Sequence, residues 1–166
     1  MNALLAVSAP FAYVTNQGDH TVSIVDVESN RVIQRVPVGK SPVGVAIDTI
    51  SNRAYFSNVE SRSVSVVDIN TNQVIHSIQL TIAPVGLVLN KTGGQLYVAD
   101  WFHDQILVFD TTQYTQVATI AMGKAPAGMV LSREGASLYV ANRDSNDVGV
   151  IDTRTHKIVN KINVGK

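Results

Sequence analysis

One short loop of this chain carries residue types that are suited to holding a ligand. Trp101, Phe102, His103 and Asp104 are consecutive, and Trp101 is the only tryptophan among the 166 residues. An exposed pair of aromatic rings beside an imidazole can bind a ring, a sugar or a side chain of a partner protein. The same rings could instead cover a channel mouth or a junction between structural units. The loop is therefore the first candidate site, and both interpretations stay open.

The rest of the sequence offers no motif for catalysis or metal binding. There is no cysteine, so disulfides and thiolate metal sites are excluded. No short ligand spacing such as His-x-x-x-His occurs, and no G-x-S-x-G nucleophile motif is found. Asp and Glu fall mostly where turns are expected, so paired-carboxylate catalysis has no support. We predict no catalytic residue, no metal ligand and no cofactor for this chain.

The framework that must position the candidate loop is a repeat of 42 residues. Tyrosine and aspartate recur at this spacing without insertion or deletion: Tyr13, Tyr55, Tyr97 and Tyr139, and Asp26, Asp68, Asp110 and Asp152. A period of this length indicates stacked supersecondary units, none of which can bury its apolar face alone. The chain is thus predicted to be one array with units at about residues 1–42, 43–84, 85–126 and 127–166.

Each unit shows signals for four antiparallel strands. In the second unit these are short runs rich in Val, Ile and Tyr and bounded by turn residues: Val43–Asp48, Ala54–Asn58, Val64–Asp68 and Gln73–Leu80. The third strand of the third unit, Ile106–Phe109, is continuously apolar, which predicts cover on both faces. Pro37 lies in a more polar fourth strand, as suits an outer edge. The predicted fold is all-β: a β-propeller of four consecutive four-stranded blades.

Residues that recur in every unit are expected to build the blade. The repeated aspartate ends the third strand, where its carboxylate can accept backbone N–H groups and close the turn. The repeated tyrosine opens the second strand, where its ring can fill the gap between neighbouring blades. Function is therefore expected among the residues that differ between units.

The repeat also resembles a known family. Ala12–Asn16 reads AYVTN and Leu138–Asn142 reads LYVAN, and both accompany V-x-V-[VI]-D in the third strand and V-G-K-x-P-x-G in the connector between units. This pattern covers essentially the whole chain and is similar to the YVTN-type β-propeller repeat family. The resemblance implies a scaffold of about seven blades in a secreted, periplasmic or surface-layer protein, and hence an extracytoplasmic location. Related propellers include haem-holding, lactonase-like and lyase-like proteins.

The chain departs from that family in its number of blades. Four units suggest either a fragment of a larger ring or a four-bladed or assembling product, and the sequence leaves both open. An open array would expose apolar faces at its two ends, which predicts self-association.

In a propeller, the loops between second and third strands share one rim with the connectors between blades. Here these loops are Asn16–Thr21, Asn58–Ser63, Asp100–Gln105 and Asn142–Asp147, and they vary while the strands repeat. The candidate binding residues on this rim are Trp101, Phe102, His103, Asp104, His20, Arg62, Arg143, Lys40 and Lys124. The basic members could attract an anion, although acidic residues on the same rim largely offset them.

Composition narrows the class of partner. Zero net charge and a pI of about 6.9 argue against nucleic-acid binding, and no apolar run approaches the roughly 18–20 residues of a membrane span. Met1–Phe11 is either a degenerate first strand or the remnant of a targeting segment.

The expected function is non-enzymatic binding of an unknown protein or small molecule at the rim. The alternative is a fragment of a redox or hydrolytic propeller enzyme whose active residues lie largely outside this chain.

Overall fold

The computed structural model describes residues 11–90 and 94–165, which form a row of antiparallel sheets. Within these residues the first blade contains β1 (Phe11–Asn16), β2 (Thr21–Asp26) and β3 (Arg31–Pro37). The second blade contains β4 (Pro42–Asp48), β5 (Arg53–Asn58), β6 (Ser63–Asp68) and β7 (Gln73–Gln79). The third contains β8 (Pro84–Asn90), β9 (Gln95–Asp100), β10 (Gln105–Asp110) and β11 (Gln116–Ala121). The fourth contains β12 (Pro126–Leu131), β13 (Ser137–Asn142), the 3₁₀ turn η1 (Arg143–Ser145), β14 (Asp147–Asp152) and β15 (Lys157–Asn163).

This architecture confirms the predicted all-β, propeller-type fold. Within each blade every strand pairs with the next one in the chain, so every sheet is a simple antiparallel meander. The prediction for Met1–Phe11 lies outside the described residues except at Phe11, which begins β1. In the described part the only helix is the single turn η1, and no helix there is long and apolar enough to cross a bilayer.

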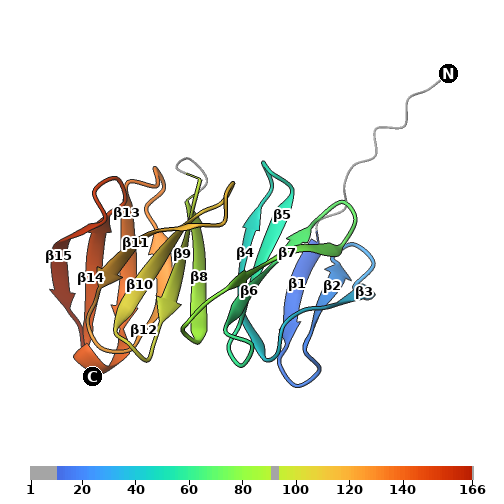
Figure 1. Ribbon diagram of the computed structural model, residues 1–166, viewed down its shortest axis with the longest axis horizontal. Coiled ribbons are helices and arrows are strands. Elements are labelled where there is room, and N and C mark those ends of the chain that lie inside the picture. Colours follow the sequence, from blue (N-terminus) through green and yellow to red (C-terminus); the bar gives the residue numbers. More distant parts are fainter. Residues whose placement is uncertain (1–10, 91–93, 166) are drawn as a thin grey trace.

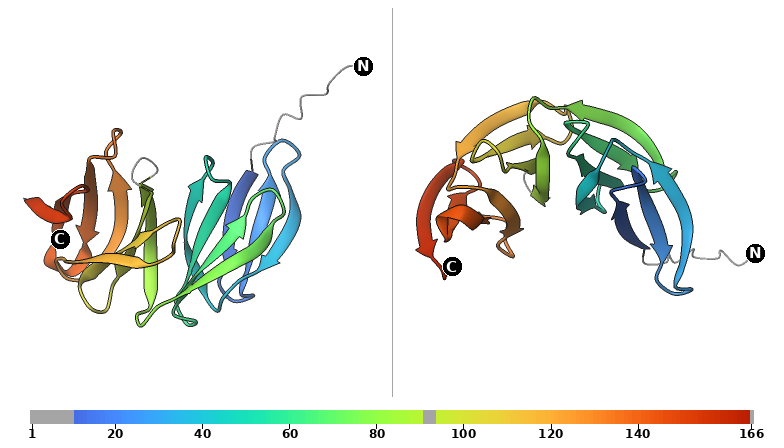
Figure 2. Two further views of the ribbon diagram at one scale, coloured as in Figure 1. Left: turned by 45° about the horizontal axis from the view of Figure 1, so that its top comes forward. Right: turned by 90° about the horizontal axis from the view of Figure 1, so that it is seen from below.

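The blades follow one another around an open arc (Figures 1 and 2). The right-hand view of Figure 2 shows β4, β8 and β12 on the inner side of the arc, while the fourth strands β7, β11 and β15 lie outside. Pro37 lies in the outer strand β3, which among the described strands pairs only with β2. The missing N–H of this proline therefore costs no hydrogen bond to a second neighbouring strand, in keeping with the expected edge position.

The repeated aspartates close the turns after the third strands, as predicted. Asp26 Oδ1 accepts the backbone N–H groups of Glu28 and Ser29, each at 2.9 Å. The same pair of bonds recurs at the other three copies: Asp68, Asp110 and Asp152. Backbone hydrogen bonds to the ionised form lower the pKa of Asp26, Asp68 and Asp152 below the ordinary aspartate value.

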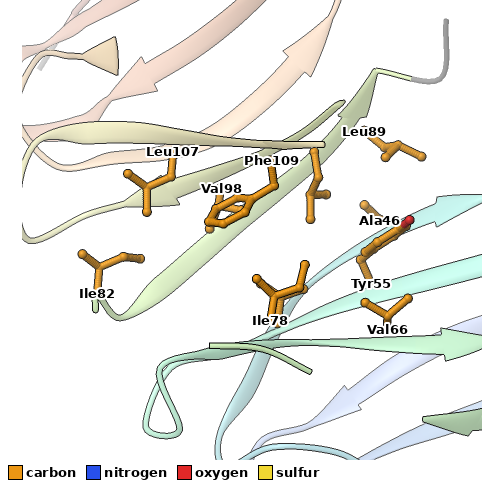
Figure 3. Close-up of a cluster of buried hydrophobic side chains, with 11 residues drawn as sticks. Ala46, Tyr55, Val66, Ile78, Ile82, Leu89, Val98, Leu107 and Phe109 are labelled. Atoms are coloured by element: carbon orange, nitrogen blue, oxygen red, sulfur yellow. The ribbon is translucent and has the colours of Figure 1, made fainter. Parts of the chain in front are cut away.

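The apolar core lies between blades, in one cluster per junction. The cluster between the second and third blades includes Ala46, Tyr55, Val66, Ile78, Ile82, Leu89, Val98, Leu107 and Phe109 (Figure 3). Tyr55 and Tyr97 are completely buried at successive junctions, which confirms that the repeated ring fills the gap between blades. Burial raises the pKa of each of these two phenols to about 12.

Candidate functional site

The candidate site is a pocket of about 570 Å³ on one rim, between the second and third blades. Three segments meet there: the loop after β5, the connector from β7 to β8, and the loop after β9. Its walls are formed by Val59, Glu60, Arg62, Thr81, Ile82, Ala83, Phe102 and His103. The pocket thus exists only because blade packing brings these three segments together.

Each rim loop is closed by a residue in the left-handed conformation. These residues occupy the same repeat position: His20, Arg62, Asp104 and Asn146, with φ between 50° and 58°. Their carbonyl groups accept the N–H of the residue that follows the blade's last strand, as in Leu80 N to Arg62 O at 2.8 Å. The loop and the following connector are therefore tied together, which fixes the positions of the pocket walls.

The third blade differs from the other blades in the last residue of its second strand, β9, directly before the loop. Asn58 donates its side-chain amide to the Ser63 hydroxyl at 3.2 Å, and Asn16 and Asn142 make the equivalent bond to the residue five positions on. In the third blade the roles are reversed: Asp100 Oδ2 accepts from Gln105 Nε2 at 2.8 Å. Asp100 is thus an acceptor where the other blades have an asparagine donor, and Gln105 is a donor where they have a hydroxyl or carboxylate acceptor.

The exchange leaves Asp100 able to hold His103. The His103 Nδ1 lies 2.8 Å from Asp100 Oδ2, and the Phe102 N–H donates to Oδ1 at 3.3 Å. The Asp100 side chain is 0% exposed whereas that of His103 is 60% exposed. Because an ionised carboxylate can only accept, Nδ1 carries the proton, and in the neutral ring Nε2 is left as an acceptor. The pair thus presents an imidazole of defined tautomer beside the pocket.

The structure separates the aromatic residues that the sequence placed together. Phe102 is 68% exposed and lines the pocket with His103. The half-buried Trp101 faces the other neighbouring blade, with the Arg143 guanidinium carbon 4.3 Å from its ring centre. Arg143 also pairs with Asp144 at 2.6 Å. Trp101 and Arg143 therefore join the third and fourth blades and do not line the pocket.

The remaining candidates lie on the same rim but outside this pocket. His20 Nδ1 accepts the Ser41 N–H at 3.1 Å, and Asp104 Oδ1 accepts the Ala125 N–H at 2.8 Å, so each holds the next connector. The exposed Lys40 and Lys124 are tied through their backbone N–H groups to hydroxyls of Ser61 and Ser145. Of the nine candidates, the pocket takes in Arg62, Phe102 and His103.

Sequence reasoning missed the residues that surround these three. Asp100 carried a usable signal, because it breaks a position that is Asn in the other blades, and Gln105 changes with it. No such sequence signal marked Val59, Glu60 or the connector Thr81–Ala83, since their role depends on which segments meet at the junction between blades. Within residues 11–90 and 94–165, no group of three or more His, Asp or Glu side chains is arranged to hold a metal ion.

The sheets and their shared rim define the protein as a β-propeller array. Its family follows from a match over residues 75–161, more than half of the chain: the protein belongs to the family described as lactonase, seven-bladed β-propeller. The comparison with curated proteins finds no match.

Among solved structures, the chain is similar to hydrazine synthase from Kuenenia stuttgartiensis, with a TM-score of 0.84 and 29% sequence identity. The match covers 92% of this chain and 45% of that one, so the present chain spans less than half the length of that relative.

Proposed function

We propose that this propeller is a non-enzymatic binding protein whose rim pocket takes a small ligand with an apolar body and one anionic group. The observation that carries the proposal is the meeting of a largely exposed Phe102 with an imidazole fixed by Asp100 on the wall of one pocket. A pocket of this size with a few converging polar groups is typical of small-molecule sites.

The apolar part of the ligand is assigned to Phe102. An aromatic ring that stays in water offers apolar area, and its removal from water stabilises a complex by about 25 cal/mol per Å². Val59, Ile82 and Ala83 add apolar surface to the same pocket. A flat or aromatic ligand body therefore fits this wall better than a sugar chain or a bare ion would.

The anionic group is assigned to Arg62. Among the described residues, no carboxylate lies within ion-pair distance of its guanidinium. An exposed guanidinium can bind a carboxylate through two parallel hydrogen bonds. Glu60 lies in the same pocket and reduces its positive potential, so a monoanion is favoured over a polyanion. His103 Nε2 then serves as an acceptor for a ligand hydroxyl or amide.

A titration with phenylacetate, followed by NMR of isotope-labelled protein, tests the proposal. Shifts should centre on Arg62, Phe102 and His103, and both Phe102→Ala and Arg62→Gln should weaken binding by about tenfold, or 1.4 kcal/mol. Lys124→Gln is the matched control, because it removes a positive charge from the same rim outside the pocket. Equal binding by wild type and both pocket variants would refute the site.

The proposal also covers the narrower propeller family of this protein and its location in the cell. The AYVTN and LYVAN segments support a YVTN-type propeller that works at the cell surface or in the periplasm. Fractionation of the native cells with an antibody against this chain tests the location, and recovery in the cytoplasm alone would contradict it.

A hydrolytic or redox enzyme is the second candidate. The family match favours hydrolysis, and the Asp100–His103 pair supplies a group that could take a proton from water as it attacks a lactone carbonyl. Glucono-δ-lactone hydrolysis, measured with wild type and His103→Ala, checks this alternative. For the redox form, a Soret band in the absorbance spectrum of the full-length protein would favour a haem cofactor.

A further inference from the structure

A second cavity lies at the same blade junction as the rim pocket, beside the outer strands β7 and β11. We call it the outer cleft. It has a volume of about 290 Å³ and is lined by residues 76–81, which lead from β7 into the connector, and by Leu107, Phe109, Tyr114 and Gln116. Thr81 is the residue that the outer cleft shares with the rim pocket. The two cavities therefore adjoin at Thr81.

Polar contacts close the equivalent space between the first and second blades. The Asn58 side-chain amide donates to Ser65 Oγ at 3.0 Å, and the Gly39 N–H donates to the same oxygen at 3.3 Å. A Cβ atom added at Gly39 would lie 2.6 Å from Asn58 Cγ, so the connector packs directly on the asparagine. Two strands and the connector are thus joined at one serine hydroxyl.

All three of these positions differ at the junction that holds the rim pocket. The glycine, asparagine and serine are replaced there by Thr81, Asp100 and Leu107. The Leu107 side chain has no polar atom, so it can bond neither to the Thr81 N–H nor to residue 100. Asp100 instead accepts from Gln105 and His103. Thr81 and Leu107 both line the outer cleft, which therefore occupies the place of these polar contacts.

The junction between the third and fourth blades is closed in another way. Gly149 occupies the position of Leu107, and the Met122 methyl carbon lies 2.7 Å from the place where a Cβ of residue 149 would be. The cavity there is about 150 Å³ and is lined in part by Asp147 and Lys161, which form an ion pair at 2.9 Å. The outer cleft is larger than this cavity and has no ion pair among its lining residues.

The walls of the outer cleft suit an uncharged apolar group. Leu107 and Phe109 pack in one cluster with Ile78 of the second blade, and all three are at most 5% exposed (Figure 3). The rings of His76 and Tyr114 stack across the junction with their centres 4.4 Å apart. None of the residues that line the cleft is Asp, Glu, Lys or Arg. A volume of about 290 Å³ is at the lower limit for a small-molecule site, so the cleft fits an extension of the rim pocket better than a separate site.

We propose that the outer cleft is a second compartment of the rim-pocket site, and that the ligand is an aryl-substituted carboxylate that carries an alkyl chain. The carboxylate and the ring lie in the rim pocket, and the chain passes Thr81 and packs on Leu107 and Phe109. The inference rests on the proposed function, because it takes the position of the head group from Arg62 and Phe102. It adds the length of the ligand and the chemistry of its far end.

Calorimetric titration of the protein with phenylacetate and with 4-butylphenylacetate tests the proposal. The two compounds share the ring and the carboxylate, so a difference in affinity reports on the butyl chain. Burial of this chain should lower the dissociation constant at least about tenfold. The NMR signals of the Leu107 methyl groups should shift with 4-butylphenylacetate and stay in place with phenylacetate.

Gln116→Trp places a large side chain in the outer cleft. Gln116 is exposed, so the fold should tolerate the change, and the gain from the butyl chain should disappear while the affinity for phenylacetate stays the same. The matched control is Val74→Trp, which adds the same ring at the equivalent position of the second blade, outside both cavities, and should keep the gain. Leu107→Ser restores the serine of the second blade and should also abolish the gain.

The results separate this inference from the proposed function. If phenylacetate binds at Arg62 and Phe102 but the butyl chain adds no affinity, the inference fails and the proposed function stands. A gain that survives both Gln116→Trp and Leu107→Ser would also overturn the inference. If 4-butylphenylacetate alone binds, with shifts confined to the outer cleft, the continuity at Thr81 is wrong. Binding of neither compound would overturn both proposals.

Discussion

Replacing Asp100 by asparagine, the residue at this position in the other blades, should destabilise the third blade. The completely buried Asp100 carboxylate is bonded by Gln105 Nε2 and His103 Nδ1, each at 2.8 Å, and by the Phe102 N–H at 3.3 Å. An asparagine keeps one acceptor oxygen but turns an NH₂ group toward the Gln105 amide or the imidazole. One charged hydrogen bond is then lost and a buried donor is left unmatched.

The magnitude follows from these contacts. A hydrogen bond to a charged group contributes about 1.5–3 kcal/mol, and an unsatisfied buried donor costs a similar amount. His103 can recover part of the loss by changing tautomer, so we expect the free energy of unfolding to fall by about 2–3 kcal/mol. For a chain of this size, that corresponds to a Tm lowered by roughly 5–10 °C.

Urea denaturation, monitored through the fluorescence of Trp101 next to Asp100 in the chain, measures the loss of stability close to the substituted residue. The double variant Asp100→Asn/Gln105→Ser recreates the pairing of Asn58 with Ser63 in the second blade. It should restore all but about 1 kcal/mol, so that the second change recovers about 1–2 kcal/mol of the loss, and the coupling energy between the two positions exceeds this recovery by the cost of Gln105→Ser alone. An Asp100→Asn variant as stable as wild type, or a double variant less stable than that single one, would refute the reasoning.

Three further outcomes are expected. Burial raises the pKa of Tyr55 and Tyr97 to about 12, so the stability that these neutral phenols contribute should be complete below about pH 10 and be lost as the pH rises toward 12. Between pH 8 and pH 11, the free energy of unfolding should therefore fall less in Tyr97→Phe than in wild type. Asp68→Ala should be less stable than wild type at pH 7, and the difference should shrink as the pH falls through the lowered pKa of Asp68; equal differences at pH 7 and pH 3 would contradict this. Gly86→Ala should cost about 1–3 kcal/mol in thermal unfolding, since its Cβ would lie 2.2 Å from a carbonyl oxygen, whereas Gly128→Ala should be neutral; equal effects would contradict the repeat comparison.

Much of the fold could be predicted because its signals are local. The turn after each third strand needs only an aspartate and the two N–H groups that follow it, so Asp26 and Asp68 indicated it without tertiary information. The rim was predictable for a related reason: residues that differ between blades are released from blade building. Neither signal says which neighbouring blade a loop residue will face.

That choice separated the candidate residues. Trp101 and Phe102 are adjacent in the chain, yet Trp101 lies against Arg143 of the fourth blade and Phe102 lines the pocket beside the second. His20 could have been a ligand-binding group, but its Nδ1 accepts a hydrogen bond from the connector. The directions of these side chains are set by contacts between blades, which a list of residue types does not contain.

The sequence by itself determined the repeat unit, its strands and turns, and the loop most different from its equivalents, because these depend on residues close together in the chain. Only the tertiary structure decided that Arg62, Ile82 and His103 share a pocket, since they belong to three segments joined by blade packing. It also decided that Gly128 meets no strand while Gly86 does. These two glycines occupy the same repeat position and differ only in whether another blade packs against them.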